Sequence, residues 1–303
     1  MLRLLIWLSK VTFCVIKSIG AVGHKNNGYQ ELMLTYKFPT EKTKIYRSVF
    51  ESTSYDMYAN MFASECHIWI RDTQSLNNEK FNDCANKHGK ALVVLGDSHA
   101  MNLYNIVAKN EASPFVLGVS QGDCPTNNKD FCHYKTFLEF LKFNTNKIDR
   151  VIYHQSGSWL MEDRNGNVDS QLAFEGHFSS FSYDDIRAAL EYLEKLSKSY
   201  SVNVTWIGPF LEFRRNPLEV IGTDDLMFVN PNSVRLFGDL EAAMIGILSS
   251  SSEIEYLKFS DVFFEPIKPF IGNCFVFRDR DHYSQCGEKI IAERSNLSWL
   301  KER

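Results

Sequence analysis

The chain has 303 residues, of which 44% are hydrophobic and 23% are charged, and its formal net charge is −4. This composition is ordinary for a globular protein and excludes collagen-like, disordered and low-complexity chains. An acidic chain without a long basic stretch is also a poor candidate for binding nucleic acid. The length predicts one or two domains, and the 14% of aromatic residues predict a large core and a stacking surface for sugars or other flat ligands.

The first 23 residues combine a basic start, apolar stretches and small residues, as signal peptides do. Lys10 divides the apolar run, so neither part reaches the ~20 residues of a membrane-spanning helix. Arg3, Lys10 and Lys17 are evenly spaced and share one helix face. We expect a signal peptide, an interfacial helix or the end of a membrane region encoded upstream, each of which places residues 30–303 beside or beyond a membrane. A soluble amphipathic helix is the alternative.

Strands and helices are expected to alternate along most of the chain. Residues 24–60 show no clear periodicity and are predicted to form a linker. Strands are expected at 91–95, 115–119, 151–153, 202–207 and near 255–262. Helices are expected at 99–109, 134–143, 183–199 (after a capping box at Ser182), 232–248 and 284–300. This alternation predicts one α/β domain at 61–303, a three-layer sandwich around a mainly parallel sheet.

Seven cysteines divide into one isolated residue, Cys14, and six that fall into local pairs. None of them form a Cys-x-x-Cys pattern, which argues against a zinc ribbon or a thioredoxin-like site. We expect disulfides between neighbours, namely Cys66 with Cys84, Cys124 with Cys132, and Cys274 with Cys286. Such bonds persist in oxidising compartments and therefore indicate export. Six buried free thiols are the alternative.

Ser98 lies where the first regular strand ends and a helix begins, the edge of an open α/β sheet at which active sites gather. A serine hydroxyl needs a base to take its proton, and the base needs an orienting acid. Asp279 and His282 supply both within one turn near the C-terminus, with Asp281 as a competing acid. Asp97 is expected to serve the turn or the helix cap rather than the chemistry.

Gly96-Asp97-Ser98-His99 followed later by Asp279-x-x-His282 resembles the SGNH (GDSL-like) hydrolase superfamily. The chain looks most like the SGNH domain fused behind the membrane part of acyltransferase-3-type O-acyltransferases, which acylate cell-surface polysaccharides outside the cytoplasm. The likeness covers roughly residues 60–300. It also rests on the flanking cysteines and on residues that follow the second, third and fourth strands: Gly122, Cys124-Pro125, Trp159 and Gly208-Pro209.

The resemblance implies an SGNH-hydrolase-like, flavodoxin-like topology and a serine triad. Ser98 matches the nucleophile, His282 the base and Asp279 the acid that orients the base. Gly122 matches the glycine of the second family block, whose N–H joins the N–H of Ser98 in the oxyanion hole.

The sequence departs from the family in the third block, Gly-x-Asn-Asp, whose asparagine is a further oxyanion donor. Here the third strand is followed by His154-Gln-Ser-Gly-Ser-Trp159. Either Gln155, Ser156 or Ser158 replaces the asparagine, or two backbone donors suffice.

Five residues are expected to line a substrate cleft: His99, His154, Gln155, Ser158 and Trp159. Aromatic side chains stack on sugar rings, but core packing is the alternative for Trp159, and His99 can equally be a polar residue at a helix start. The sequence contains no metal-binding constellation, and we expect neither a metal nor a cofactor.

These features predict an extracytoplasmic, serine-dependent O-acyltransferase (O-acetyltransferase) that acts on cell-surface polysaccharide such as lipopolysaccharide O-antigen. A membrane acyltransferase partner would present the acyl group, on the periplasmic or extracellular face of a bacterial membrane. A carbohydrate esterase (deacetylase) with the same triad and a non-catalytic glycan-binding module are the alternatives. The expected organisation is a membrane-proximal segment at 1–23, a linker at 24–60 and the SGNH-like domain at 61–303.

Overall fold

The computed structural model describes residues 40–110, 112–126, 132–168, 178–212, 231–266 and 268–300. The described residues from Val49 onward form one compact unit. The membrane-proximal segment predicted at residues 1–23 lies outside the described residues. Within the described part of the chain, no helix is both long enough and apolar enough to cross a membrane.

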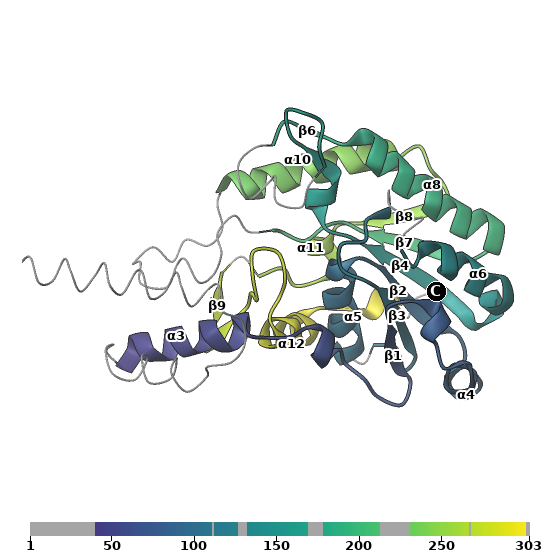
Figure 1. Cartoon of the computed structure of the whole chain (residues 1–303), viewed down its shortest axis with the longest axis horizontal. Helices are drawn as coiled ribbons and strands as arrows, with labels where there is room; N and C mark the ends of the chain where they lie inside the picture. The colour runs from purple at the N-terminus through teal and green to yellow at the C-terminus, as the bar shows by residue number, and fades with distance from the viewer. Residues whose placement is uncertain are drawn as a thin grey trace, which may run out of the picture. The chain divides into compact units, whose positions relative to one another are not determined.

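Six parallel strands form the central sheet, in the order β1-β3-β2-β4-β7-β8 (Figure 1). The strands are β1 (His67–Ile70), β2 (Ala91–Gly96), β3 (Val116–Ser120), β4 (Ile148–His154), β7 (Asn203–Ile207) and β8 (Ile254–Leu257). If β1 is left out, the strand order is the flavodoxin-like one. From β2 the chain first adds β3 on one side and then returns to add β4 on the other side, so the strand order reverses at β2. The predicted parallel sheet and α/β fold are confirmed.

Helices cover both faces of the sheet, which gives the predicted three layers. One core contains Val93 and Leu95 and packs against α4 (Asn78–His88), α6 (Tyr134–Asn144), α8 (Tyr183–Tyr200) and α10 (Pro231–Leu248). The other contains Leu92 and Val94 and packs against α5 (Ser98–Asn110) and α12 (Gln285–Arg294). Successive strand residues point to opposite faces, so a strand buried on both faces reads as a continuous apolar run.

Short elements complete the chain. The helical ones are α3 (Thr40–Thr53), α11 (Phe259–Val262) and the 3₁₀ turns η1 (Tyr58–Asn60), η2 (Thr73–Ser75), η4 (Thr145–Lys147), η5 (Gly157–Leu160) and η6 (Ser298–Leu300). Two antiparallel pairs are formed by β5 (Met161–Glu162) with β6 (Ser180–Phe181) and by β9 (Phe270–Ile271) with β10 (Cys274–Phe275).

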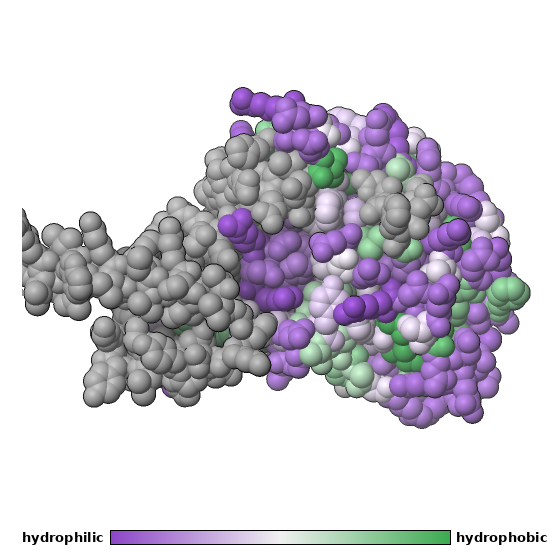
Figure 2. Space-filling model, viewed as in Figure 1, coloured by the Kyte–Doolittle hydropathy of each residue, from purple (hydrophilic) through white to green (hydrophobic). Residues whose placement is uncertain are grey.

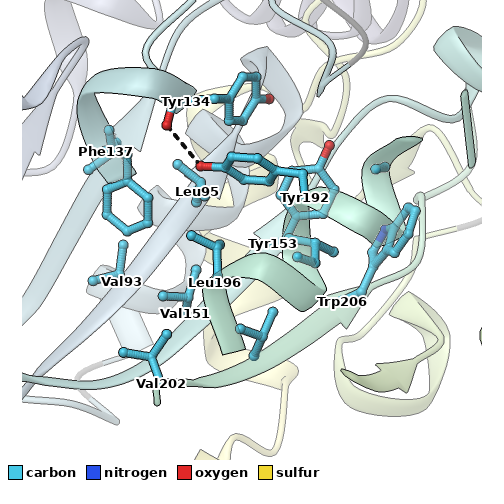
Figure 3. Packing of buried hydrophobic residues seen from close by; sticks show 14 of the residues in the cluster. Val93, Leu95, Tyr134, Phe137, Val151, Tyr153, Tyr192, Leu196, Val202 and Trp206 are labelled. Atoms are coloured by element: carbon cyan, nitrogen blue, oxygen red, sulfur yellow. Dashed lines mark hydrogen bonds between the residues drawn. The ribbon is translucent and has the colours of Figure 1, made fainter. Parts of the chain in front are cut away.

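Large aromatic side chains fill the core between the sheet and α6 and α8 (Figure 3). Tyr153 and Trp206, on neighbouring strands, pack edge to face with ring centroids 5.4 Å apart. The buried hydroxyl of Tyr192 donates to the carbonyl oxygen of Tyr134 at 3.1 Å. Because its polar atom is hydrogen-bonded, this tyrosine can be buried without leaving an unsatisfied donor.

The polar surface leaves little apolar area exposed on the face shown in Figure 2, where hydrophobic side chains form separate spots. Few large hydrophobic side chains of the described residues are exposed, and they are spread along the chain: Tyr58, Phe143, Tyr183, Val234 and Ile245. Single exposed hydrophobic residues of this kind are normal on a globular protein.

The predicted helix start at Ser182 is confirmed, because its hydroxyl accepts the N–H of Asp185. Three other expectations need correction. The last helix ends at Arg294 rather than 300, since Ser295 Oγ donates to the Ile291 carbonyl oxygen and the chain then becomes extended. The strand near 255–262 is β8 followed by the short helix α11. Strand β1 was not predicted because four residues are too few to show a period, and helix α4 because most of its eleven residues are polar.

All three predicted disulfides are present: Cys66–Cys84, Cys124–Cys132 and Cys274–Cys286. The first joins the residue before β1 to α4, and the second lies between β3 and α6. The third joins β10 to α12 across the Asp279–His282 turn. Disulfides of this kind persist in an oxidising compartment.

Gly96 provides a test of the packing at the end of β2. It pairs with His154 of β4, and a Cβ at Gly96 would lie 1.8 Å from the His154 carbonyl oxygen. We expect Gly96→Ala to destabilise the protein by at least ~1–3 kcal/mol, because backbone must move. Gly238→Ala is the matched control: nothing lies within 4 Å of the added methyl, in the interior of α10. It should raise stability by ~0.5–1 kcal/mol. Urea unfolding measures both, and equal midpoints would refute the packing argument.

Candidate active site

Ser98, the predicted nucleophile, is the first residue of α5 and follows β2 at the point where the strand order reverses. Ligands of open α/β sheets bind at such a point, outside the carboxyl ends of the strands. Asp97 is buried beside it and accepts the N–H of His99 at 2.8 Å and the N–H of Ser156 at 2.9 Å. As predicted, Asp97 is a structural residue, because its carboxylate ties the start of α5 to the loop after β4.

Asp279 and His282, the predicted acid and base, form a closed turn. The carboxylate of Asp279 accepts the backbone N–H groups of Asp281 and His282 at 3.1 and 2.8 Å. Its two oxygens lie 2.9 and 3.1 Å from Nδ1 of His282. Asp281 Oδ1 also lies 3.1 Å from this nitrogen. Both acids that the sequence offered therefore face the same ring atom.

Nε2 of His282, the other ring nitrogen, is buried and has no hydrogen-bond partner among the described residues. In particular, it is not hydrogen-bonded to Ser98, although the structure describes both residues. Catalytic hydrogen bonds are often loose without substrate and tighten when substrate binds. The fixed Nδ1 and unpartnered Nε2 leave this imidazole able to accept a proton.

The two carboxylates control the charge of His282. Burial disfavours the imidazolium, but Asp279 and Asp281 outweigh it and raise the pKa of His282 well above its ordinary value. Burial likewise opposes ionisation of Asp281, yet His282 and His99 hold the pKa of Asp281 well below its usual range. These carboxylates stabilise the imidazolium that forms when the histidine takes a proton from a nucleophile, and the ring acts as a base only in its neutral form.

His99 packs beside the Asp-His turn. Its buried ring stacks on Phe210, with centroids 4.3 Å apart, and meets His282 edge to face at 5.1 Å. Nε2 of His99 lies 3.6 Å from Asp281 Oδ2. Ligand atoms of His99, Asp281 and His282 lie within 4.8 Å of one another, a spacing that a metal ion could use. The three residues already pair with one another, so a metal there would compete with the orientation of His282.

Gly122, the predicted oxyanion-hole glycine, lies against Ser98. A Cβ at Gly122 would lie 3.9 Å from the Cβ of Ser98 and only 2.3 Å from Oη of Tyr58. The N–H of Gly122, the predicted oxyanion donor, already donates to this phenol oxygen at 3.1 Å. Tyr58 was missed at the sequence level, because it lies in the stretch predicted as a linker and belongs to no motif.

The segment that replaces the third family block is held by Glu212, a buried acid that the sequence did not single out. Its carboxylate accepts hydrogen bonds from the hydroxyls of Ser156 and Ser158. It also accepts the N–H groups of Gly157 and Ser158 at 2.6 and 3.2 Å. Gln155 Oε1 accepts hydrogen bonds from Tyr153 and Thr126. The two hydroxyls proposed to replace the asparagine therefore already donate to Glu212.

The residues predicted to line a cleft are mostly buried. His99, His154, Gln155 and Ser158 are at most 2% exposed, whereas Trp159 is half-buried. Burial and the nearby His99 lower the pKa of His154 to about 3, and its Nδ1 lies 3.1 Å from the Ile207 carbonyl oxygen. His154 is therefore uncharged at neutral pH, and a substrate-contacting role for these residues stays a prediction.

A buried polar network joins the helix that begins at Ser98 to the helix that follows His282. The Asn102 side chain accepts the N–H of Tyr283 at 3.2 Å and donates to its carbonyl oxygen at 3.3 Å. Glu288, fully buried in α12, accepts hydrogen bonds from four side chains: Asn102, Asn105, Lys109 and Tyr55. The backbone next to His282 is thereby fixed to the first turns of α5.

A family model described as the SGNH domain fused to AT3 domains matches residues 65–295. The chain therefore belongs to this SGNH family and is an SGNH-type acyltransferase or ester hydrolase. The search of curated proteins found no match.

Several solved structures align with the chain, at low similarity. A protein from Lactobacillus plantarum is 16% identical, with a TM-score of 0.42, over 71% of this chain and 97% of that one. A candidate SGNH hydrolase from Slackia heliotrinireducens is 14% identical, with a TM-score of 0.36, over 67% and 95%. A catalytic mutant of an acetylxylan esterase from Geobacillus stearothermophilus is 13% identical, with a TM-score of 0.37, over 71% and 94%. These likenesses are too distant to carry an argument, so the assignment rests on the family match.

The charge pairing at His282 can be tested by titration. Asp281→Asn removes a carboxylate that raises the pKa of His282, so that pKa should fall towards the ordinary ~6.5. Because the folded pKa lies above the unfolded one, the imidazolium stabilises the fold below about pH 6.5. This contribution is lost as the pH rises through the folded pKa, and it should shrink in the variant. NMR titration of the ring measures the shift, with the exposed Asp184→Asn as control; an unchanged pKa in Asp281→Asn would contradict the pairing.

Proposed function

We propose that this chain is an extracytoplasmic, serine-dependent O-acyltransferase domain that acts on cell-surface polysaccharide. Ser98 is the nucleophile, His282 the base and Asp279 the acid that orients it. The observation that carries the proposal is the His282 ring, whose Nδ1 faces Asp279 while the buried Nε2 has no hydrogen-bond partner among the described residues. The family description supports transfer, since its members are SGNH domains fused to AT3 domains.

The proposed first half-reaction transfers an acyl group to Ser98. Oγ attacks the carbonyl carbon of the donor, Nε2 of His282 takes the hydroxyl proton, and the carbonyl oxygen becomes an oxyanion. When the oxyanion collapses, the bond to the donor's leaving group breaks and His282 returns the proton to that group. The N–H of Ser98 lies at the N-terminus of α5, where the helix dipole favours the negative charge.

The second half-reaction runs in the opposite sense. A sugar hydroxyl attacks the acyl-Ser98 carbonyl carbon and gives its proton to Nε2, and Ser98 leaves as the hydroxyl. Asp279 holds the ring in one tautomer throughout, while Asp281 adds negative charge that stabilises the imidazolium. With water as the acceptor, the same steps make a carbohydrate esterase.

The proposed compartment and partner follow from the disulfides and the family. Three disulfides suit the periplasm or the extracellular face of a bacterial membrane. A membrane acyltransferase of the AT3 type, carried on the same or another chain, would deliver the acyl group. Residues 1–23 would anchor or export the domain, as the sequence predicts. The linker predicted at 24–60 is too long, because the residues from Val49 onward belong to the same compact unit as the domain 61–303.

The nucleophile can be tested with p-nitrophenyl acetate as the acyl donor. We expect an acetyl group on the Ser98-containing peptide by mass spectrometry, and Ser98→Ala should lower p-nitrophenol release by roughly 10⁴-fold, to the background. Ser250→Ala, an exposed serine at the end of α10, is the matched control and should behave as wild type. Adding O-antigen polysaccharide should speed loss of the acetyl group and yield acetylated sugar. Undiminished acetylation of Ser98→Ala would exclude the triad.

A further inference from the structure

The phenol hydroxyl of Tyr58 is bonded to Gly122, the glycine whose N–H the family resemblance assigns to the oxyanion hole. Its oxygen accepts the Gly122 N–H at 3.1 Å, and Gly122 also lies next to Ser98. A Cβ built on Gly122 would lie 2.3 Å from the phenol oxygen and 3.9 Å from Ser98 Cβ. The hydroxyl and the nucleophile therefore border the same small space, beside the backbone that the family uses to bind the oxyanion.

The surroundings of Tyr58 hold its ring in position. Its ring packs edge to face on Trp69 at 6.1 Å, and the guanidinium of Arg71 lies 4.5 Å from the ring centroid. The preceding Met57 is 1% exposed, and Tyr55 donates a hydrogen bond to the buried Glu288. Tyr58 as a whole is 37% exposed. A side chain anchored on both sides yet open to solvent can meet a substrate without a large rearrangement.

Two of the other candidates for a third donor already use their protons elsewhere, because the hydroxyls of Ser156 and Ser158 donate to Glu212. A tyrosine hydroxyl that accepts one hydrogen bond keeps its own proton for another. Chains of hydrogen bonds also polarise each other, so the bond from Gly122 N–H strengthens Tyr58 as a donor.

We propose that Tyr58 is a catalytic residue that donates a hydrogen bond to the oxyanion in place of the asparagine of the third family block. This inference rests on the proposed function. As Ser98 Oγ bonds to the carbonyl carbon, the carbon–oxygen π bond opens and its electrons move to the oxygen. The proton of Ser98 goes to His282, while the proton of Tyr58 stays on the phenol and only bridges to the oxyanion. The bond shortens as negative charge develops, which stabilises the transition state more than the bound ester.

Tyr58→Phe tests this role, because it removes the hydroxyl and keeps the ring that packs on Trp69. With p-nitrophenyl acetate, the rate of Ser98 acetylation should fall by about 10²-fold or more, with little change in KM. Tyr183→Phe, an exposed tyrosine at the start of α8, is the matched control and should leave the rate unchanged. Thermal unfolding of each variant checks that the fold is intact.

A thionoester substrate separates a donor from a packing residue. Its sulfur accepts hydrogen bonds weakly. If the hydroxyl acts on the oxyanion, wild type and Tyr58→Phe should therefore acetylate Ser98 at nearly equal rates with the thionoester. An equal loss with both substrates would overturn the inference in favour of packing. An unchanged or faster acetylation with the oxygen ester would overturn it as well, the faster rate meaning that the hydroxyl obstructs the carbonyl site.

The outcomes for Tyr58 and for the proposed function are distinguishable. If wild type acetylates Ser98 and Tyr58→Phe does so equally well, only the role of Tyr58 fails. If wild type forms no acetyl-Ser98, or Ser98→Ala is still acetylated at the same rate, the proposed function fails and the role of Tyr58 fails with it.

Discussion

The buried contact between α5 and α12 is the constraint on which the candidate site depends. Ser98 opens α5 and His282 precedes α12, so the packing of these two helices determines how the two residues face each other. A fully buried carboxylate is costly unless it is paired, and Glu288 meets this condition only when Asn102, Asn105, Lys109 and Tyr55 all reach it. If one helix shifted along the other, the Glu288 carboxylate would lose these hydrogen bonds while still buried. The cost of an unpaired buried carboxylate therefore favours one relative position of the two helices.

Buried acids also fix the backbone at two other places around the site. Asp97 bonds the start of α5 to the loop after β4, and Glu212 gathers the N–H groups and hydroxyls of residues 156–158. Burial raises the pKa of each of these carboxyls, which is the electrostatic cost of placing them in the interior. Loops carry backbone donors that no strand or helix satisfies, and a carboxylate can satisfy several at once. The loops around Ser98 are therefore fixed by acids in addition to the three disulfides.

The sequence was sufficient for features whose signal is local. β2 and β3 were predicted because strands buried on both faces are continuous apolar runs, and β4 and β7 from shorter apolar stretches. The cysteine pairs were predicted because their partners are near in the chain. β1 was missed because a four-residue strand is too short to show a period. Glu212 and Tyr58 were missed for a different reason. Their importance lies in contacts with Ser158 and Gly122, which are 54 and 64 residues away, and no local pattern encodes such contacts.

The third-block asparagine is missing from this sequence, but the hydrogen bond that it would donate can come from a residue elsewhere in the chain. An oxyanion responds to the position and strength of a donor, and the order of donors along the chain has no bearing on it. Here the loop after β4 uses its polar groups to bind Glu212, which fixes the loop but leaves the site short of a donor. The segment before β1 contributes Tyr58, whose hydroxyl bonds to Gly122 beyond the end of β3. Under the proposed function, the family's chemistry is conserved in space while the residue that performs one part of it has moved to another segment.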